Sequence, residues 1–391
     1  MKMATPTEKL TQGTDSGIWL IAGFLAIISL LTSISTQVWA GHLPFLIAAG
    51  VLMWIFSKIN YQKLSIFSNI GLLLAFALLL FTRITGGFDA RSIEIGSHQI
   101  QTMYFIGFLL TFYLSKYLAV KVNNQVKTGE KITLREIITQ CIIISIICAG
   151  IFTSKQSTGI ILFIICTILL LLGGVKFKQI ASFIGICLIL VLFVVNLGLF
   201  RSSTLENRIS YWWTGELTME KITDGEELTP TELKEREKYY KAYGEQMVYS
   251  QAMIARASWF PTKVGQAYLK DEIPAGKNDY VFAVIVEEFG ILIGIFVLSL
   301  YLFLLFRAIR IAQRSEGIFA KLLASSIGLW ISLLAIVHIA VNSGMMPATG
   351  ETLPLISNGG MGIVFTGILL GILLNISKYS EKKPIKHIPN L

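Results

Sequence analysis

The run YVFAVIVEEFGILIGIFVLSLYLFLLF, residues 280–306, is apolar apart from two adjacent glutamates near its start. It exceeds the roughly 20 residues that a helix needs to cross a bilayer, so it predicts a transmembrane segment. The residue directly before it is Asp279, an acid at the predicted membrane boundary. Ionisable groups in or beside a bilayer are costly, so Asp279 is a candidate for function.

Apolar runs of this kind make up most of the chain. The sequence has 391 residues, of which 54% are hydrophobic and 15% charged, and its mean hydropathy is +0.67. This composition excludes a soluble domain. We predict an all-α polytopic membrane protein, because backbone groups in lipid must be satisfied within helices and no period-two pattern indicates a barrel. We expect about ten spans, near residues 17–35, 43–57, 64–82, 102–120, 136–153, 157–174, 180–200, 280–306, 322–342 and 361–376.

Lysine and arginine are distributed unequally between the two predicted sides. When the short connections are compared, one side holds nearly all of them, and the other keeps only Arg83, Arg91 and Lys155. The positive-inside rule places the basic side in the cytoplasm. This bias also accounts for most of the net charge of +9, so the basic composition predicts no nucleic acid partner.

The spans and this orientation divide the chain into a single membrane domain, 1–391, with distinct polar segments. Both termini are predicted to be cytoplasmic, as an N-terminal tail at 1–16 and a basic tail at 377–391. The loop at 201–279 is then extracytoplasmic and ends in Asp279. Within it we expect a helix from Thr229 to about residue 259, started by Thr229 as cap and by a capping-box glutamate three residues later. Its apolar second half is expected to pack on the bundle or lie in the interface.

Two blocks of polar and glycine-rich sequence flank the last spans. The first is Asn278-Asp279-Tyr280-Val281-Phe282-Ala283, followed by Glu287-Glu288-Phe289-Gly290. The second is Pro347-Ala348-Thr349-Gly350-Glu351-Thr352-Leu353-Pro354, followed by Ser357-Asn358-Gly359-Gly360. Non-helical backbone at such a position is tolerated where it lines a cavity, so we favour a re-entrant loop over a simple turn for the second block.

These blocks resemble those of the SEDS family (shape, elongation, division and sporulation), the polytopic peptidoglycan polymerases with an FtsW and a RodA branch. The resemblance extends over essentially the whole chain, with ten spans and a large loop after the seventh. Gln246 lies where the family has a Gln-rich segment, and Arg208 where an arginine opens the loop. The short 246–255 segment and the compact length favour the FtsW (division) branch, with RodA (elongation) as a close second.

The chain departs from the family pattern at several places. Residues 90–93 lack a tryptophan, and 257–262 replace a glycine-rich loop. Gln101-Thr102-Met103-Tyr104 stands where the family has Gln-Pro-Ser-Glu, and Ser154-Lys155-Gln156-Ser157-Thr158 replaces a turn containing Pro-Asp. Leu355, Asn358 and Met361 also differ from the commoner residues. The chain is therefore expected to be a divergent member.

The resemblance implies that lipid II, a disaccharide peptide on undecaprenyl pyrophosphate, is polymerised outside the cytoplasmic membrane. Asp279 is then expected to act as general base in an inverting displacement of undecaprenyl pyrophosphate. A divalent cation, Mg or Mn, shared between Asp279 and the pyrophosphate is a candidate cofactor. Candidate cations for the leaving group are Arg208, Arg91, Lys277 and Arg256, and further substrate-binding candidates are Gln246, Glu288, Thr349 and Ser357.

The family also implies partners and a location. A monofunctional class B penicillin-binding transpeptidase is expected to crosslink the strands, alongside other division proteins. The expected location is the cytoplasmic membrane of a bacterium, at the division septum.

Other readings remain open at this point. A lipid II flippase would use the same bundle without needing an external carboxylate, and a structural scaffold would tolerate loss of Asp279. A polysaccharide ligase would be expected to carry histidines in its external loop, and residues 201–279 contain none. Asp279 is also placed to cap the following helix, and Glu287 and Glu288 to form structural pairs.

Overall fold

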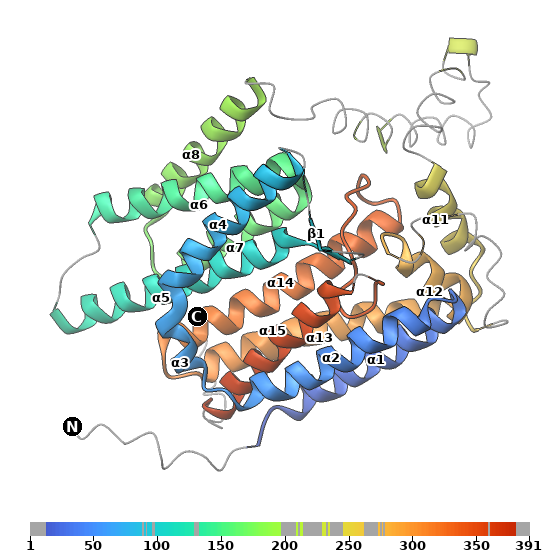
Figure 1. Cartoon of the computed structure of the whole chain (residues 1–391), viewed down its shortest axis with the longest axis horizontal. Helices are drawn as coiled ribbons and strands as arrows, with labels where there is room; N and C mark the ends of the chain where they lie inside the picture. The colour runs from blue at the N-terminus through green and yellow to red at the C-terminus, as the bar shows by residue number, and fades with distance from the viewer. Residues whose placement is uncertain are drawn as a thin grey trace, which may run out of the picture.

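The computed structural model describes residues 13–380 except 88–89, 91, 96–97, 129–132, 197–208, 210–211, 214–228, 232–233, 235–244, 262–272, 274–275, 277 and 359. The described chain is almost entirely helical (Figure 1), which confirms the predicted all-α class. Its elements are α1 (Ser16–Ser35), α2 (Trp39–Lys58), α3 (Tyr61–Leu64), η1 (Ser65–Phe67), α4 (Ser68–Gly86), β1 (Ile93–Ile95), β2 (His98–Ile100), α5 (Thr102–Thr128), α6 (Leu134–Ser154), α7 (Gln156–Leu172), α8 (Phe177–Asn196), α11 (Glu245–Arg256), α12 (Val281–Phe289), α13 (Ile291–Arg314), α14 (Ile318–Asn342) and α15 (Met361–Lys378).

Eight helical segments in the described residues are long and apolar enough to cross a membrane. Two further apolar helices, 156–172 and 177–189, are shorter and correspond to the predicted spans 157–174 and 180–200. The apolar runs therefore located the helices well, and the count of ten crossings stays a prediction.

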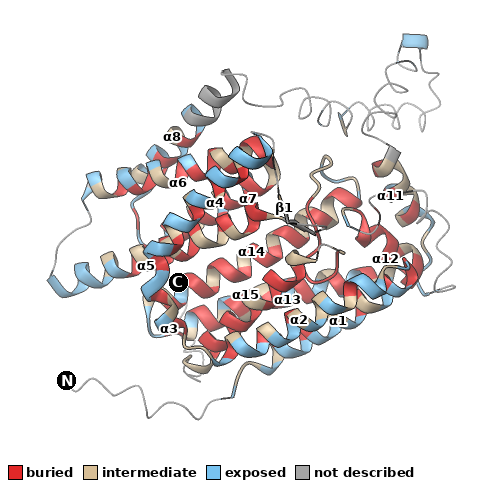
Figure 2. Cartoon of the chain, viewed as in Figure 1, coloured by how far each residue is buried: buried red, intermediate tan, exposed pale blue. Residues whose placement is uncertain are grey.

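Helix α14 lies at the centre of the bundle. It contacts α5, α7, α11, α12, α13 and α15, and about 72% of its most apolar stretch is buried. Helices α2 and α4 lie at the periphery, where pale blue exposed residues alternate with buried ones in Figure 2. Their exposed side chains include Trp54 and Leu73, as expected for surfaces that face lipid.

Two glycines allow α15 to pack closely on α2. A Cβ atom at Gly367 would lie 2.4 Å from the carbonyl oxygen of Ala49, and one at Gly371 would lie 2.6 Å from that of Met53. Apolar burial does not drive helices together in lipid, so close backbone approach through small residues is a common way to pair them. The spacing of four residues puts both glycines on one face of α15.

The predicted single span at 280–306 is wrong. The chain forms a short helix, α12, then breaks at Gly290 and continues as α13. Gly290 has φ of +89°, and a Cβ atom there would lie 2.7 Å from the carbonyl oxygen of Trp259. Segment 257–261 supplies backbone partners at this break, because Ile291 N–H donates to Ser258 O at 2.9 Å. The break follows from a long-range contact that the apolar run does not reveal.

Helix α11 matches the second half of the helix expected in the large loop. Met247, Ser250 and Met253 are buried on it, and it contacts α12 and α14. This confirms the expectation that this half packs on the bundle, whereas residues 232–233 and 235–244 of the expected helix lie outside the described part. A small antiparallel hairpin, β1–β2, with Ile93 opposite Ile100, was not expected from the sequence.

The helices alternate in direction, so their connections gather at two ends. Turn 36–38, the β1–β2 hairpin and residues 343–358, with the start of α12, lie at what we call the Asp279 end (Figure 1). At the opposite end, Asp15 caps α1 and pairs with Arg307 of α13, and its backbone N–H donates to Ser377 Oγ of α15 at 3.0 Å. We call this the Arg307 end.

Candidate functional site

Asp279 lies in a turn that is held by the last residue of α14. The Asn342 side chain donates from Nδ2 to Asp279 O at 3.0 Å, and its Oδ1 accepts from Ala283 N–H at 3.0 Å. Asn342 is fully buried, while Asp279 is partly exposed. The N-cap position of α12, considered as an alternative role for Asp279, is filled by Tyr280. The Asp279 backbone is therefore fixed from the bundle core, and its side chain lies at the surface of this end.

The second polar block packs directly against this turn. A Cβ atom at Gly350, whose φ is +68°, would lie 3.3 Å from Asp279 Oδ2. Ser357 Oγ donates to Asn278 O at 2.7 Å and accepts from Leu353 N–H at 2.7 Å. Residues 351–357 are all buried, in agreement with a re-entrant loop. The structure thus brings together two blocks that are about 70 residues apart in sequence.

Thr349 precedes Gly350 in this loop. Its Oγ1 atom is buried and has no hydrogen-bond partner within the described residues. Such atoms are rare in folded proteins and point to a contact with water, an ion or a ligand. Thr349 is therefore placed near Asp279 as a candidate substrate contact, and its role stays a prediction.

Asp279 supplies one carboxylate at this end of the bundle, and a metal ion shared with the substrate stays a prediction. In the part of the chain that the structure describes, no three His, Cys, Asp or Glu side chains come close enough to hold a metal ion. Mg²⁺ is often held by one or two carboxylates together with substrate phosphates and water. The single carboxylate of Asp279 would fit a site of this kind, in which substrate phosphates and water supply the other ligands.

Glu288 lies on the short helix α12, one residue before its end. It is buried at the contact of α12 with α1, where Ser35 Oγ donates to its Oε2. The structural pairing considered for Glu288 therefore includes a serine hydroxyl. Its predicted role in substrate binding is untested.

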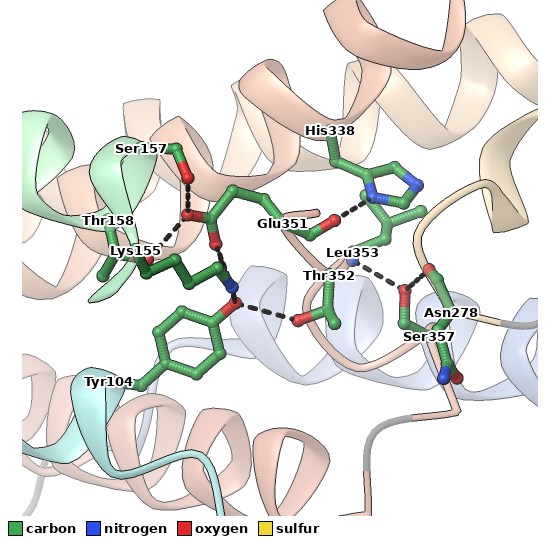
Figure 3. A network of polar contacts seen from close by, with 10 residues as sticks. All are labelled: Tyr104, Lys155, Ser157, Thr158, Asn278, His338, Glu351, Thr352, Leu353 and Ser357. Atoms are coloured by element: carbon green, nitrogen blue, oxygen red, sulfur yellow. Dashed lines mark hydrogen bonds and ion pairs between the residues drawn. The ribbon is translucent and has the colours of Figure 1, made fainter. Parts of the chain in front are cut away.

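A buried polar network lies behind the second block, as Figure 3 shows. Lys155, between α6 and α7, pairs with Glu351 Oε2 at 3.0 Å and donates to Tyr104 Oη at 2.8 Å. Glu351 also accepts hydrogen bonds from Tyr104 Oη, Ser157 Oγ and Thr158 Oγ1, at 2.7, 2.6 and 2.7 Å. Its backbone oxygen lies 2.7 Å from His338 Nδ1, which donates to it. The network joins α5, α7 and α14 to the loop.

This network keeps the side chains of Lys155 and Glu351 ionised. Burial lowers the pKa of Lys155, but the charge of Glu351 and the contacts with Tyr104 outweigh it and raise the pKa above its usual value. Burial likewise raises the pKa of Glu351, but Lys155 and the hydroxyl donors outweigh it and lower the pKa below its usual value. The ion pair therefore persists over the whole neutral pH range.

The structure says less about the position of the remaining predicted substrate-binding residues relative to Asp279. Gln246 is half-buried on α11, and Arg256 is exposed at the C-terminal end of the same helix. Ser250 Oγ of α11 donates to Asn342 O at 2.9 Å, so this helix borders the Asp279 turn. Arg208, Arg91 and Lys277 lie outside the described residues.

Sequence reasoning missed Asn342 and the pairing of Lys155 with Glu351. Asn342 ends an apolar run, where a polar residue is unremarkable. The available signals were Lys155, a cation on the side that has few, and Glu351, an acid within an otherwise apolar and glycine-rich block.

Comparison with known proteins identifies the family. A family model described as "Cell cycle protein", which groups FtsW, RodA and SpoVE, matches residues 16–382. The chain belongs to the FtsW/RodA/SpoVE family. This confirms the resemblance that the two polar blocks indicated.

Curated relatives in the FtsW/RodA/SpoVE family include several FtsW proteins. A probable peptidoglycan glycosyltransferase FtsW of Buchnera aphidicola subsp. Schizaphis graminum is 30% identical over 310 residues, which are 78% of each chain. The protein of the same name from Bacillus subtilis is 28% identical and covers 94% of this chain and 91% of its own.

Solved structures confirm the fold of the family. One similar chain comes from a peptidoglycan synthase complex that coordinates polymerization and crosslinking, with a TM-score of 0.67, 18% identity and coverage of 94% of this chain and 99% of that one. Another is the rod shape determining protein RodA of Thermus thermophilus, with a TM-score of 0.64, 15% identity and coverage of 95% and 99%. At these identities the likeness concerns the fold alone.

Proposed function

We propose that this protein is a peptidoglycan glycosyltransferase that polymerises lipid II into β-1,4-linked strands on the outer face of the cytoplasmic membrane during cell division. The observation that carries the proposal is the placement of Asp279. Its backbone is held by Asn342, and its carboxylate lies beside Gly350 at a partly exposed end of the bundle. The names of the FtsW relatives support the same reaction.

In this reaction Asp279 is the general base. It accepts the proton of the acceptor sugar hydroxyl while that oxygen attacks the anomeric carbon of the donor. The bond from this carbon to undecaprenyl pyrophosphate breaks, and the pyrophosphate leaves with the electron pair. A single displacement inverts the anomeric centre, and a placed base typically contributes about 10²–10⁴-fold to the rate.

The leaving pyrophosphate requires cationic groups or directed donors. We propose Arg208, Arg91 and Lys277 for this role, with Arg256 at the edge of α11. Gln246, Thr349 and Ser357 are proposed to bind the sugar or phosphate groups, and so is Glu288. When bound, a Mg or Mn ion held by Asp279 would neutralise part of the developing charge.

The wider assignments are also proposals. We infer that a class B penicillin-binding transpeptidase crosslinks the strands, since the reaction above makes no crosslinks. The Lys and Arg bias supports cytoplasmic termini, and the FtsW relatives support a septal location among division proteins over the RodA-like alternative.

Polymerisation of lipid II by the purified protein with its transpeptidase, scored as glycan chains on a gel, tests the proposal. Wild type and Asp279→Asn are compared with Mg, with Mn and with a chelator, and lipid II binding is measured in parallel. The expected result is muramidase-sensitive chains from wild type alone, with equal lipid II binding by both proteins.

Three other outcomes would overturn parts of the proposal. Equal chain formation by Asp279→Asn would remove Asp279 from the mechanism. If neither protein forms chains but both move lipid II across a vesicle bilayer, the flippase alternative replaces the polymerase. Unchanged activity with the chelator would remove the metal.

A further inference from the structure

Lys155 is a cation in an unusual place. It lies in the one-residue connection between α6 and α7, yet its side chain is only 8% exposed. Its ammonium contacts Glu351 and Tyr104, both buried. A lysine at a helix connection normally extends to water or headgroups, so its burial needs a compensating role.

The hydrogen-bonding capacity of Glu351 is taken up within the network. One carboxylate oxygen accepts from Ser157 and Thr158, and the other accepts from Tyr104 and Lys155. With both oxygens engaged, this carboxylate has no room to accept a substrate proton. Its geometry suits holding the loop in place, not reacting.

Glu351 is joined covalently to the part of the loop that touches Asp279. Gly350, the preceding residue, lies beside Asp279 Oδ2. The Glu351 backbone oxygen is held by His338, one helical turn before Asn342, which holds the Asp279 backbone. Both sides of the contact between the loop and Asp279 are therefore anchored to neighbouring turns of α14.

The side chains that contact Glu351 come from two segments that are far apart in the sequence. Tyr104 lies on α5, and Lys155, Ser157 and Thr158 lie at the start of α7 or just before it. All four contact Glu351. The loop that carries Glu351 is thus coupled to α5 and α7.

Stability alone does not explain a buried ion pair, because an apolar replacement of similar volume is often neutral or stabilising. We propose that Lys155 is a positioning residue: through Glu351 it fixes the 343–360 loop so that Gly350 stays against the carboxylate of Asp279. This inference rests on the proposed polymerase function. Lys155 itself does not touch the substrate.

The test uses the full-length protein with its transpeptidase and measures kcat and KM for lipid II polymerisation. The central variant is the double substitution Lys155→Gln/Glu351→Gln, which removes both charges and leaves no unpaired buried ion. Thermal stability in detergent and lipid II binding are measured on the same samples. A misplaced catalytic group can cost up to about 100-fold, so we expect kcat to fall by about 10- to 100-fold with KM within about twofold of wild type.

The matched control is the ion pair at the Arg307 end, Arg307→Gln/Asp15→Asn. It joins α13 to the start of α1 far from Asp279 along the helices, and we expect its kcat to remain within about twofold of wild type. The single variant Lys155→Arg keeps the charge with a larger head group, and we expect an intermediate loss of kcat.

Three results would overturn the inference. One is a wild-type kcat in the Lys155→Gln/Glu351→Gln protein. Another is a loss of activity that merely follows the loss of folded protein. The third is an equal loss of kcat in the Arg307-end control. Asp279→Asn is run beside these variants: if it forms chains as fast as wild type, Asp279 is not the base and the proposed mechanism fails, whereas an inactive Asp279→Asn with an active double variant contradicts only the positioning role.

Discussion

Two carboxylates flank Gly350 and behave in opposite ways. Glu351 is 1% exposed and accepts from four donors, among them the ammonium of Lys155. Asp279 is partly exposed, and the contact that holds it in place reaches its backbone from Asn342. A carboxylate enclosed by donors is locked in its charged form, whereas a partly exposed carboxylate can be reached from outside the bundle. The contrast supports the proposals of a structural role for Glu351 and a catalytic role for Asp279.

Among the substitutions that test this contrast, we expect Asn342→Leu to lower kcat the most. The substitution releases the Asp279 turn from α14, and small misplacements of a catalytic group can cost up to about 100-fold. We expect kcat to fall by about 10- to 100-fold, with a loss of about 1–3 kcal/mol for each buried group left unsatisfied. Glycan chain formation and thermal unfolding in detergent measure the two effects.

Asn375→Leu is the matched control for Asn342. Asn375 is equally buried and has the same pattern, with Oδ1 accepting from Tyr61 N–H at 2.9 Å and Nδ2 donating to Ser57 O at 3.0 Å, but it lies at the Arg307 end. We expect similar destabilisation and normal kcat in the folded protein. Equal kcat losses in both variants would contradict a local role for Asn342.

Gly350→Ala is expected to have a smaller effect. The new methyl group would lie 3.3 Å from Asp279 Oδ2, and the φ of +68° disfavours a side chain by about 1–2 kcal/mol. We expect kcat to fall by about three- to tenfold, measured at saturating lipid II. Gly174→Ala, with φ of +75° and no atom within 4 Å of the new Cβ, carries the same backbone penalty. An equally large loss of kcat in Gly174→Ala would show that the effect of Gly350→Ala does not depend on its contact with Asp279.

The ion pair predicts a window of pH in which stability is constant. The folded pKa of Glu351 is lowered, so its contribution is present above its unfolded value near 4.5 and is lost as the pH falls through the folded pKa. The folded pKa of Lys155 is raised, so its contribution is present below 10.5 and is lost as the pH rises through the folded pKa. Tm measured against pH should fall more steeply in wild type than in Lys155→Gln/Glu351→Gln beyond both limits. Parallel curves would show that the pair contributes nothing to folding.

Ser357→Ala should have the smallest effect. It removes the bond to Asn278 O and the acceptor for Leu353 N–H, each worth about 1 kcal/mol. We expect a lower Tm and a kcat within about threefold of wild type, because Asn342 and Gly350 still hold the turn. Lipid II binding by the same variant tests the proposed substrate contact of Ser357, and unchanged lipid II binding would contradict that contact.

The helices were predictable because each apolar run must bury its backbone groups within itself in lipid. The two polar blocks and Asp279 were also predictable, since they interrupt that pattern. Their meeting was not, because Ser357 and Asn278 are 79 residues apart and no local signal connects them. The break at Gly290 within 280–306 was not predictable for a similar reason. It depends on the packing of segment 257–261 against Gly290, and a glycine in an apolar run does not by itself indicate a break.

Lys155 and Glu351 show the limit of reading charges along a chain. In the topology prediction, Lys155 served only as one of the few basic residues on the external side. A comparison of the two sides gives no information about which residue Lys155 contacts. Its pairing with Glu351 spans 196 residues and depends on three hydroxyl side chains from α5 and α7. Burial of both charges is a property of the packed bundle, so a single sequence does not contain it.

The most direct test of the account changes each of the two carboxylates to its amide in the same assay. Chain formation from lipid II, lipid II binding and Tm are measured for Asp279→Asn and Glu351→Gln with the transpeptidase present. We expect Asp279→Asn to keep its Tm and its lipid II binding and to lose about 100-fold or more in rate. We expect Glu351→Gln to lose Tm and to retain measurable chain formation. Full activity of Asp279→Asn would contradict the catalytic role of Asp279. An inactive Glu351→Gln protein with an unchanged Tm would contradict the structural role of Glu351.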